Sequence, residues 1–484
     1  MKIGLINVNF RSEGPETLMG YMTPLHLLAL GGPLIDAGFT DTALIDAQND
    51  DLDLKETIAA ILDQKFEIVF ISAMAATAAS PLVLSVMRGV KAINPNVYLV
   101  TGGVHASYEY ETMMRDYPDL DFIGRGEGEQ FAVDLVTCLE EKGDLGRVKS
   151  LVWRKNGKIT VNEKASKLPD LDVYRVGWEL IEDWSKYRVP MTGELGAVVQ
   201  FSRGCPFTCT FCGQWDFWVE WRHRSISKFV DDLEMLRHKY GVTYFFFADE
   251  NPQTLPETWY GLFDEIRTRQ LDIHMIMNLR VTDIVRDQKQ LQLYREAGVV
   301  TVDLGVEAVT QDRLEEVNKK TTVNHNARAI QLLRDNGILS IVQTIVGFPD
   351  ETPERLQLTF ERLKEWSPDL LHFYYVTPFP FTTLGSQITP EDIAEKDLSK
   401  WDYRHTIMRL KHMTPNELRS MVKKFTFEYN FNPKNFFQIL NNPNPYLRES
   451  LINALFLILK NRSQLASFAT QSSTISNLEL LRSA

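Results

Sequence analysis

The sequence predicts an α/β protein with three parts: a doubly wound, flavodoxin-like sheet, a partial (β/α)6 barrel and a small C-terminal helical region. Two observations support this prediction. Apolar strand-like runs alternate with helical patterns up to about residue 380, and the strand-like runs then stop. The runs are rich in Val, Ile and Leu, which is typical of strands buried on both faces of a parallel sheet.

The first alternating series covers residues 1–145 and contains five strand–helix units. Units of this length are typical of a doubly wound domain, in which ligands bind at the carboxyl ends of the strands. The predicted strands are residues 2–8, 41–47, 66–72, 96–102 and 121–124. The predicted helices lie near residues 23–37, 54–64, 79–93, 107–115 and 128–141.

Residues 146–195 are predicted to form a hairpin and a linker. The hairpin is residues 148–163, because Asn156-Gly157 is a strong two-residue turn signal between two alternating strands. The segment 165–195 contains "KLPDLD" and scattered aromatic residues, and we interpret it as a bridging linker.

The second alternating series covers residues 196–384. Six successive strand–helix units predict a barrel or partial barrel, whose active site lies at the carboxyl ends of the strands. The predicted strands are residues 196–202, 244–249, 274–280, 301–307, 339–348 and 370–379. The predicted helices are residues 226–239, 256–269, 287–297, 310–317, 323–336 and 352–366. In the final region, residues 385–484, helical patterns lie near 414–428, 433–439 and 446–461.

The bulk composition excludes several classes of protein. The net charge of −12 argues against a general nucleic-acid binder, which usually has a basic face. No run reaches 18 apolar residues, so we expect no transmembrane segment, and no secretory signal is evident. The apolar run 451–460 predicts an amphipathic helix, packed on the core or lying on a membrane surface. Four cysteines do not make a disulfide framework and suit a reducing, cytoplasmic setting.

Three of the four cysteines follow the first strand of the second series, as Cys205-x3-Cys209-x2-Cys212. A structural zinc site uses four ligands, whereas three thiolates can hold three irons of a [4Fe–4S] cube and leave the fourth iron open. The alternatives are chance clustering or a zinc site completed by His223. The remaining cysteine, Cys138, lies on an apolar helix face and is interpreted as a small buried side chain.

This cysteine loop, after the first strand of a six-unit β/α series, resembles that of the radical S-adenosylmethionine (SAM) enzymes. The resemblance implies that SAM binds the open iron and that its reductive cleavage gives a 5′-deoxyadenosyl radical, which abstracts a substrate hydrogen. "ADENP" stands where the family often has a Gly-Gly-Glu-type motif, so the contacting atom there is open. An ion pair between Arg280 and Glu307 is the alternative for those two residues. The implied SAM contacts are Asp249, Glu250, Arg280, Glu307 and Gly347.

A doubly wound domain before such a barrel resembles the cobalamin-binding domain of the B12-dependent subgroup, with "SAMAAT" (72–77) and "TGGVHAS" (101–107) as matching stretches. Gln48 stands where many cobalamin folds have a lower axial histidine, so cobalamin is expected to bind without that ligand. His105 is either a satisfied loop histidine or a cofactor contact. A flavin or nucleotide is the alternative ligand. The implied cobalamin contacts are Asp46, Ser72, Thr77, Gly102, Gly103, Gly126 and Glu127.

The run "CGQWDFWVEWRHRS" (212–225), together with "ADENP", resembles the anaerobic Mg-protoporphyrin IX monomethyl ester oxidative cyclases over roughly residues 1–380. The resemblance implies closure of the fifth chlorophyll ring on a Mg-porphyrin and an external reductant such as ferredoxin or flavodoxin. Aromatic faces can stack on a flat macrocycle, and arginines can pair with a propionate. The implied substrate contacts are Trp215, Trp218, Arg222 and Arg224.

Other functions remain open at this point. The same scaffold can support radical methylation of an unactivated carbon by methylcobalamin. A paralogue can bind tetrapyrrole or cobalamin without turnover, although the three-cysteine motif argues against it. A ferredoxin-like electron carrier usually has four cysteine ligands per cube. The tryptophans can also simply pack the barrel mouth.

Overall fold

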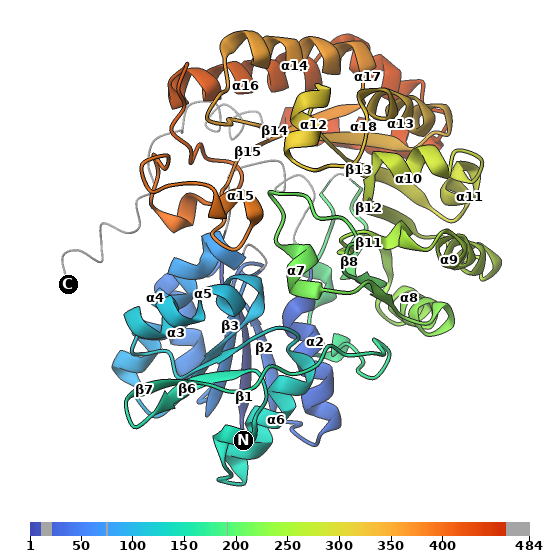
Figure 1. Ribbon diagram of the computed structural model, residues 1–484. Coiled ribbons are helices and arrows are strands. Elements are labelled where there is room, and N and C mark those ends of the chain that lie inside the picture. Colours follow the sequence, from blue (N-terminus) through green and yellow to red (C-terminus); the bar gives the residue numbers. More distant parts are fainter. Residues whose placement is uncertain (11–21, 74–75, 191, 461–484) are drawn as a thin grey trace.

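The computed structural model describes residues 1–10, 22–73, 76–190 and 192–460 (Figure 1). It contains a seven-stranded sheet, a six-stranded sheet and a two-stranded ribbon, β9 (Ser202–Arg203) with β10 (Arg222–His223). The N-terminal domain, blue to cyan in Figure 1, lies against one end of the barrel, and helices follow in the C-terminal region. This arrangement confirms the predicted fold class. Residues 461–484 of the predicted helical region lie outside the described residues.

The N-terminal sheet has the strand order β2-β1-β3-β4-β5-β6-β7, and its first five strands are parallel. The order reverses between β1 and β3, as in flavodoxin-like sheets, and ligands bind at such a switch point. One apolar cluster packs α2 and α6 on one face, and another packs α3, α4 and α5 on the opposite face. The strands are β1 (Ile3–Asn7), β2 (Thr42–Asp46), β3 (Ile68–Ser72), β4 (Tyr98–Thr101) and β5 (Phe122–Gly124). The helices are α2 (Leu25–Asp36), α3 (Leu54–Asp63), α4 (Ala76–Ile93), α5 (Gly103–Asp116) and α6 (Glu129–Glu140).

The predicted hairpin forms, as β6 (Leu151–Lys155) and β7 (Lys158–Val161). It pairs with β5 and so extends the N-terminal sheet, although the sequence analysis grouped it with the linker. The turn signal lies within the hairpin itself, so it predicts the hairpin but not the pairing of β6 with β5. The domain boundaries themselves stay predictions.

The linker that follows is packed between the two sheets. Its short 3₁₀ turns, Trp178–Leu180 and Trp184–Lys186, bury Trp178 and Trp184 in the same apolar cluster as the barrel helices. The Tyr187 hydroxyl donates a 2.8 Å hydrogen bond to Asp46 at the end of β2. The linker therefore fixes the N-terminal sheet against the barrel.

The second sheet has the order β15-β14-β13-β12-β11-β8, with every pair parallel, which confirms the partial barrel. Its strands are β8 (Leu195–Val199), β11 (Val242–Phe247), β12 (His274–Arg280), β13 (Val299–Glu307), β14 (Leu339–Val346) and β15 (Leu370–Tyr375). Its outer helices are α8 (Ile226–Tyr240), α9 (Pro256–Thr268), α10 (Val281–Arg286), α11 (Leu291–Glu296), α12 (Gln311–Glu316), α13 (Val323–Asp335) and α14 (Pro353–Trp366).

One predicted helix in this series begins too early, and the short helix before it was not predicted. Residues 287–297 were expected to be helical, but α11 begins only at Leu291, and α10 precedes it directly after β12. Asp287 lies between the two helices, where it is buried and accepts a 2.6 Å hydrogen bond from the Tyr294 hydroxyl. A buried carboxylate that collects side-chain donors favours a break in the helix over a regular turn.

The open barrel leaves two sheet edges, and other segments cover both. The backbone N–H of Val198 in β8 donates to the Thr23 hydroxyl at 2.8 Å. At the opposite edge, Asn430 accepts from the Leu371 N–H at 2.9 Å and donates to its carbonyl at 3.0 Å. Covered edges do not recruit other chains. The C-terminal helices, orange to red in Figure 1, are α15 (Thr383–Ser386), α16 (Pro415–Asn430), α17 (Pro433–Leu440) and α18 (Pro445–Lys460).

None of the described helices is both long and apolar enough to span a bilayer.

Candidate active site

A cavity of about 1570 Å³ lies where the carboxyl ends of the two sheets face each other. Ordinary small-molecule pockets measure roughly 300–1,000 Å³, so this space has room for more than one large ligand. Its wall is mainly apolar, with backbone from the N-terminal loops and polar side chains from the barrel strands. These barrel side chains are Gln200, Glu250, Asn278, Asp303, Gln343 and His372.

The cysteine loop joins β9 to the short helix α7 (Gln214–Trp218). It begins at Gly204, which has a φ of +98° and lies so near the next segment that a Cβ would approach the Glu220 carbonyl oxygen to 2.4 Å. Only glycine fits this position without displacing the backbone. Cys205 and Cys212 are half-buried, Cys209 is buried, and all three thiols are free.

The thiols are close enough to influence one another electrostatically. Burial raises the pKa of Cys205, and it raises the pKa of Cys212 to about 11; a charge on Cys209 adds to both shifts. The Arg280 guanidinium opposes this at Cys205 and lies 3.6 Å from the Cys209 sulfur. Arg280 also covers the ring of Phe207, 3.6 Å from its centroid. A cation therefore faces Cys205 and Cys209 and favours their ionised, metal-binding form.

These residues fit a [4Fe–4S] cube. Three free thiols project from one short loop beside a fixed cation, and cysteine thiolate is the usual ligand of such clusters. In the described part of the chain, no three His, Cys, Asp or Glu side chains are close enough to hold a single metal ion. A cube binds each cysteine to a different iron and so needs wider spacing than one ion does.

Two predicted SAM contacts lie beside the cysteine loop but do not pair with each other. Glu307 ends β13 with a φ of +65° and forms a buried 2.6 Å ion pair with Lys319. Arg280 instead donates to the backbone carbonyl of Lys319. The alternative of an Arg280–Glu307 ion pair is therefore wrong, because Lys319 occupies the position between them. Lys319 was not singled out in the sequence, since no motif marks it.

The adjacent carboxylates of "ADENP" differ in their surroundings. Asp249 is buried and accepts hydrogen bonds from the Ser202 hydroxyl at 2.6 Å and from the Phe201 N–H at 3.1 Å. Glu250 lines the cavity and accepts a 3.2 Å bond from the Gly204 N–H. Burial raises the pKa of Glu250 to about 7, and the charge of Asp249 adds to the shift. Asp249 thus braces the ribbon, whereas Glu250 is the carboxyl available to a ligand.

The last predicted SAM contact, Gly347, follows β14 with a φ of +84°, and its N–H donates to Glu351 at 3.0 Å. A Cβ there would approach Leu418 to 3.0 Å. Positive φ and close packing both call for glycine at this position.

The predicted cobalamin contacts divide into two groups. Ser72, Gly102, Gly103, Gly126 and Glu127 line the cavity. Gly103 and Gly126 have φ values of +86° and +88°, and a Cβ at either would meet no atom within 4 Å. These glycines present open backbone to the cavity, which is the cradle that a large cofactor requires. The domain therefore fits cobalamin.

Asp46 and Thr77 do not line this cavity. Asp46 is buried and accepts bonds from Asn7 and Tyr187, both at 2.8 Å, and burial raises its pKa. Thr77 is buried in α4. Asp46 has an evident structural role in joining the linker to the N-terminal sheet, and its role in cofactor binding stays a prediction.

The predicted substrate residues are largely engaged within the protein. Trp218 lines the cavity, with the Arg203 guanidinium 5.2 Å from its ring centroid, whereas Trp215 does not line it. Arg222 contacts Glu127 at 3.1 Å, and Glu127 also contacts Arg203 at 2.8 Å. This network crosses from the N-terminal domain to the barrel and is buried, so it fixes the relative position of the two.

Arg224 is also paired, with Asp172 at 2.8 Å and Asp232 at 2.7 Å. A substrate carboxylate would have to compete with these partners and with Glu127 for either arginine. Binding of a propionate by Arg222 or Arg224 stays a prediction.

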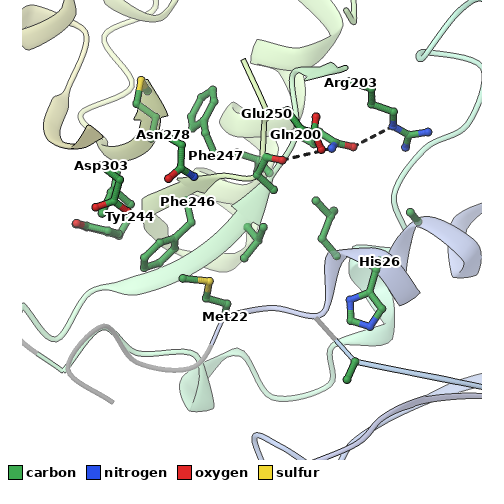
Figure 2. A pocket seen from close by; sticks show the side chains of 18 of the residues that line it. Met22, His26, Gln200, Arg203, Tyr244, Phe246, Phe247, Glu250, Asn278 and Asp303 are labelled. Carbon is green, nitrogen blue, oxygen red and sulfur yellow. Dashed lines mark hydrogen bonds between the residues drawn. The ribbon is translucent and has the colours of Figure 1, made fainter. Parts of the chain in front are cut away.

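The barrel lumen contains polar residues that the sequence analysis did not select as site residues. Asn278 and Asp303 are paired across β12 and β13 and lie together in Figure 2, at some distance from His26 of the N-terminal domain. Burial raises the pKa of Asp303 to about 7, and burial lowers the pKa of His372 to about 4. The signal was present for His372, which is a single histidine in the otherwise apolar and aromatic strand β15.

Two family models match the chain. That of the Radical SAM superfamily matches residues 199–363, and that of the B12 binding domain matches residues 16–136. The anaerobic magnesium-protoporphyrin IX monomethyl ester cyclase of Rubrivivax gelatinosus is 34% identical over 95% of this chain and 83% of its own length. The protein of that name from Synechocystis is 34% identical over 93% and 90%.

A solved structure shares the fold. The radical S-adenosylmethionine methyltransferase TsrM from Kitasatospora setae, with cobalamin and a [4Fe–4S] cluster bound, superposes with a TM-score of 0.70. The match covers 96% of this chain and 100% of that chain at 15% identity. The chain has a three-cysteine loop and a glycine cradle, and two relatives match most of its length. Its cofactors are a [4Fe–4S] cluster, SAM and cobalamin. The chain belongs to the cobalamin-dependent radical SAM enzymes, alongside the anaerobic cyclases.

Proposed function

We propose that this enzyme catalyses the anaerobic oxidative cyclisation of Mg-protoporphyrin IX monomethyl ester, which forms the fifth ring of chlorophylls. The observation that carries the proposal is the cavity of about 1570 Å³, which extends from the glycine cradle into the barrel lumen. Its mainly apolar wall suits a broad, flat macrocycle next to a corrin. The 34% identity to cyclases over most of the chain supports the same substrate.

When bound, the cluster and SAM supply a 5′-deoxyadenosyl radical that abstracts hydrogen from carbon. We assign cluster ligation to Cys205, Cys209 and Cys212, and Arg280 is placed to hold negative charge beside them. Water provides the new keto oxygen in this proposal, and the 13-propionate methyl ester arm is the site of oxidation. The electrons for SAM cleavage come from an external reductant such as ferredoxin or flavodoxin in the cytoplasm.

The chain's own residues bind and orient the substrate. Trp218 lies in the cavity wall and can stack on the macrocycle. Glu250 and Asp303, whose pKa values burial raises to about 7, are available to hold or accept a proton near neutral pH. Asn278, next to Asp303 in the register, offers a neutral hydrogen bond to the ester or keto oxygen.

A methyl transfer reaction is the second candidate, because the TsrM methyltransferase shares the whole fold. Anaerobic reconstitution with SAM, cobalamin, reductant and Mg-protoporphyrin IX monomethyl ester separates the two by mass spectrometry. Ring closure with an added keto oxygen is the expected product. A gain of one methyl group would replace the proposal with a methyltransferase, and the absence of 5′-deoxyadenosine would indicate a non-catalytic binder.

A further inference from the structure

His26 is a histidine of the N-terminal domain in the cavity wall. It lies in the first turn of α2, the helix that follows β1, and so it is near the switch point between β1 and β3 where ligands bind in this type of sheet. Figure 2 shows it on this helix, apart from the labelled residues of the barrel lumen. Its Nε2 atom is buried and has no hydrogen-bond partner in the part of the chain that the structure describes.

The helix that carries His26 is held in place on both sides. Just before the helix, the Thr23 hydroxyl accepts from the Val198 N–H of β8 at 2.8 Å. Further along, a Cβ at Gly31 would come within 2.2 Å of Leu180, and one at Gly32 within 2.2 Å of the Arg175 carbonyl oxygen. Such close contacts hold α2 against the linker, so the backbone of His26 has a fixed position at the cavity.

The state of this imidazole suits metal ligation. Burial lowers the pKa of His26 to about 4, so at neutral pH the ring is uncharged and one nitrogen lone pair is available. An unpartnered buried polar atom costs about 1–3 kcal/mol. A bound metal ion would remove that cost, and neutral imidazole is the commonest protein ligand for transition metals.

Other residues that could supply an axial nitrogen are less well placed. Gln48 follows β2, which is the edge strand of the sheet, and it is not part of the cavity wall. His105 is buried on α5 and also lies outside the wall. His372 is in the wall, but it is on β15 in the barrel, where its Nε2 is 3.2 Å from Arg404.

We propose that Nε2 of His26 is an axial ligand of the cobalt of bound cobalamin. The bond is a Co–N coordination bond to a neutral imidazole, and its formation requires no redox step. The proposal concerns the cofactor alone and holds for a cyclase and a methyltransferase alike. Its failure would leave the proposed cyclisation untouched, since that is tested by product mass.

The test is electron paramagnetic resonance of the full-length protein reconstituted with cobalamin and reduced to cob(II)alamin. An axial ¹⁴N ligand splits each cobalt line into a triplet, and a ¹⁵N ligand splits it into a doublet. Protein labelled with ¹⁵N-histidine is expected to give doublets. Triplets in the labelled protein would assign the ligand to the benzimidazole tail of cobalamin, and unsplit lines would mean no nitrogen ligand; either result overturns the proposal.

Variants identify which histidine is bound. His26→Gln is expected to abolish the splitting while cobalamin is retained, because the glycine cradle is unchanged. His105→Gln is the matched control, a buried imidazole in the same domain, and is expected to keep the doublets. The reverse pattern would assign the ligand to His105. If H26Q retains no cobalamin, labelled H105Q and H372Q decide: doublets in both support His26, and their loss in either overturns the proposal.

Discussion

The two halves of the cavity are built from different parts of the polypeptide. On the N-terminal side, part of the wall is backbone, because Gly103 and Gly126 leave open space beyond the ends of β4 and β5. On the barrel side, the strands direct polar side chains such as Glu250 and Asn278 into the lumen. In both sheets the parallel strands place their loops at the same edge, so the difference lies in the residues at that edge and not in the topology.

This difference matches the two tasks. A corrin is large and rigid, so its binding domain gains most from removing side chains and bringing backbone N–H groups close. Radical chemistry needs charges and hydrogen bonds at fixed points, and side chains on strands hold such points firmly. The contrast predicts that substitutions in the two halves will separate cobalamin binding from SAM cleavage.

The largest expected effect is the loss of the cluster. Cys209→Ala removes one of the three thiols, the one 3.6 Å from Arg280, so we expect incomplete iron loading and no detectable 5′-deoxyadenosine. Cys138→Ala is the matched control, a half-buried cysteine on α6 outside the loop, and should retain both. Iron analysis and chromatography of the products measure the outcome. Normal turnover by the Cys209→Ala protein would refute the assignment of the loop.

The next effect should be confined to the cobalamin half. Gly103→Val places a branched side chain in the open cradle at a φ of +86°, which is strained by about 1–2 kcal/mol for a residue with a Cβ. We expect cobalamin affinity to fall at least tenfold, equivalent to about 1.4 kcal/mol, with SAM cleavage retained. Cobalamin absorbance per chain measures cobalamin binding, and the amount of 5′-deoxyadenosine measures SAM cleavage.

Gly157→Val is the control for strain alone, because Gly157 has a φ of +76° in the hairpin turn, equally open but outside the cavity wall. It should bind cobalamin normally. Equal cobalamin loss in both variants would mean that the cradle has no special role.

Breaking the buried ion pair of the barrel should act mainly on stability. Glu307→Gln leaves the Lys319 ammonium without its carboxylate partner at 2.6 Å, and breaking a buried pair costs about 3 kcal/mol. We therefore expect a lower free energy of unfolding, measured in urea at pH 7, together with weaker SAM binding. Asp264→Asn, in an exposed pair with Arg267 on α9, should change stability by less than about 1 kcal/mol.

The last expected effect is a pH dependence of stability that comes from Asp303 in the barrel lumen. Burial raises the pKa of Asp303 to about 7 in the folded chain, so the unfolded chain loses this proton at lower pH. The stability of the folded state should therefore fall as the pH rises from about 4 to 7 and then level off. Asp303→Asn removes this dependence and should be more stable than the wild type at pH 8, with little difference at pH 4.

Thermal melts of the apoprotein across pH measure this difference. The exposed Asp63→Asn protein is the control and should follow the wild-type curve. If the melting temperatures of Asp303→Asn and the wild type change with pH in the same way, the Asp303 carboxyl is hydrated in the lumen and the prediction is wrong.

The sequence predicted the helices and strands better than it predicted which strands pair and which side chains meet. The strand β12 was predicted at its observed bounds, because its apolar run is local information. The predicted helix 287–297 wrongly included Asp287, because the break there depends on Asp287 meeting Tyr294 and other donors in the folded core. The hairpin was found, but not its pairing with β5. Lys319 was missed because nothing near it in the chain marks it as the partner of Glu307.

The sequence by itself determined the order of strands and helices, the loop of three thiols and the family, because these depend on residues within a few positions of one another. The tertiary structure decided which charged side chains are available. Arg222 and Glu127 lie far apart in the chain yet form one buried network, and His26 reaches the cavity only because α2 packs against the barrel edge. Long-range contacts set burial, and burial sets which groups are paired, ionised or open to a ligand.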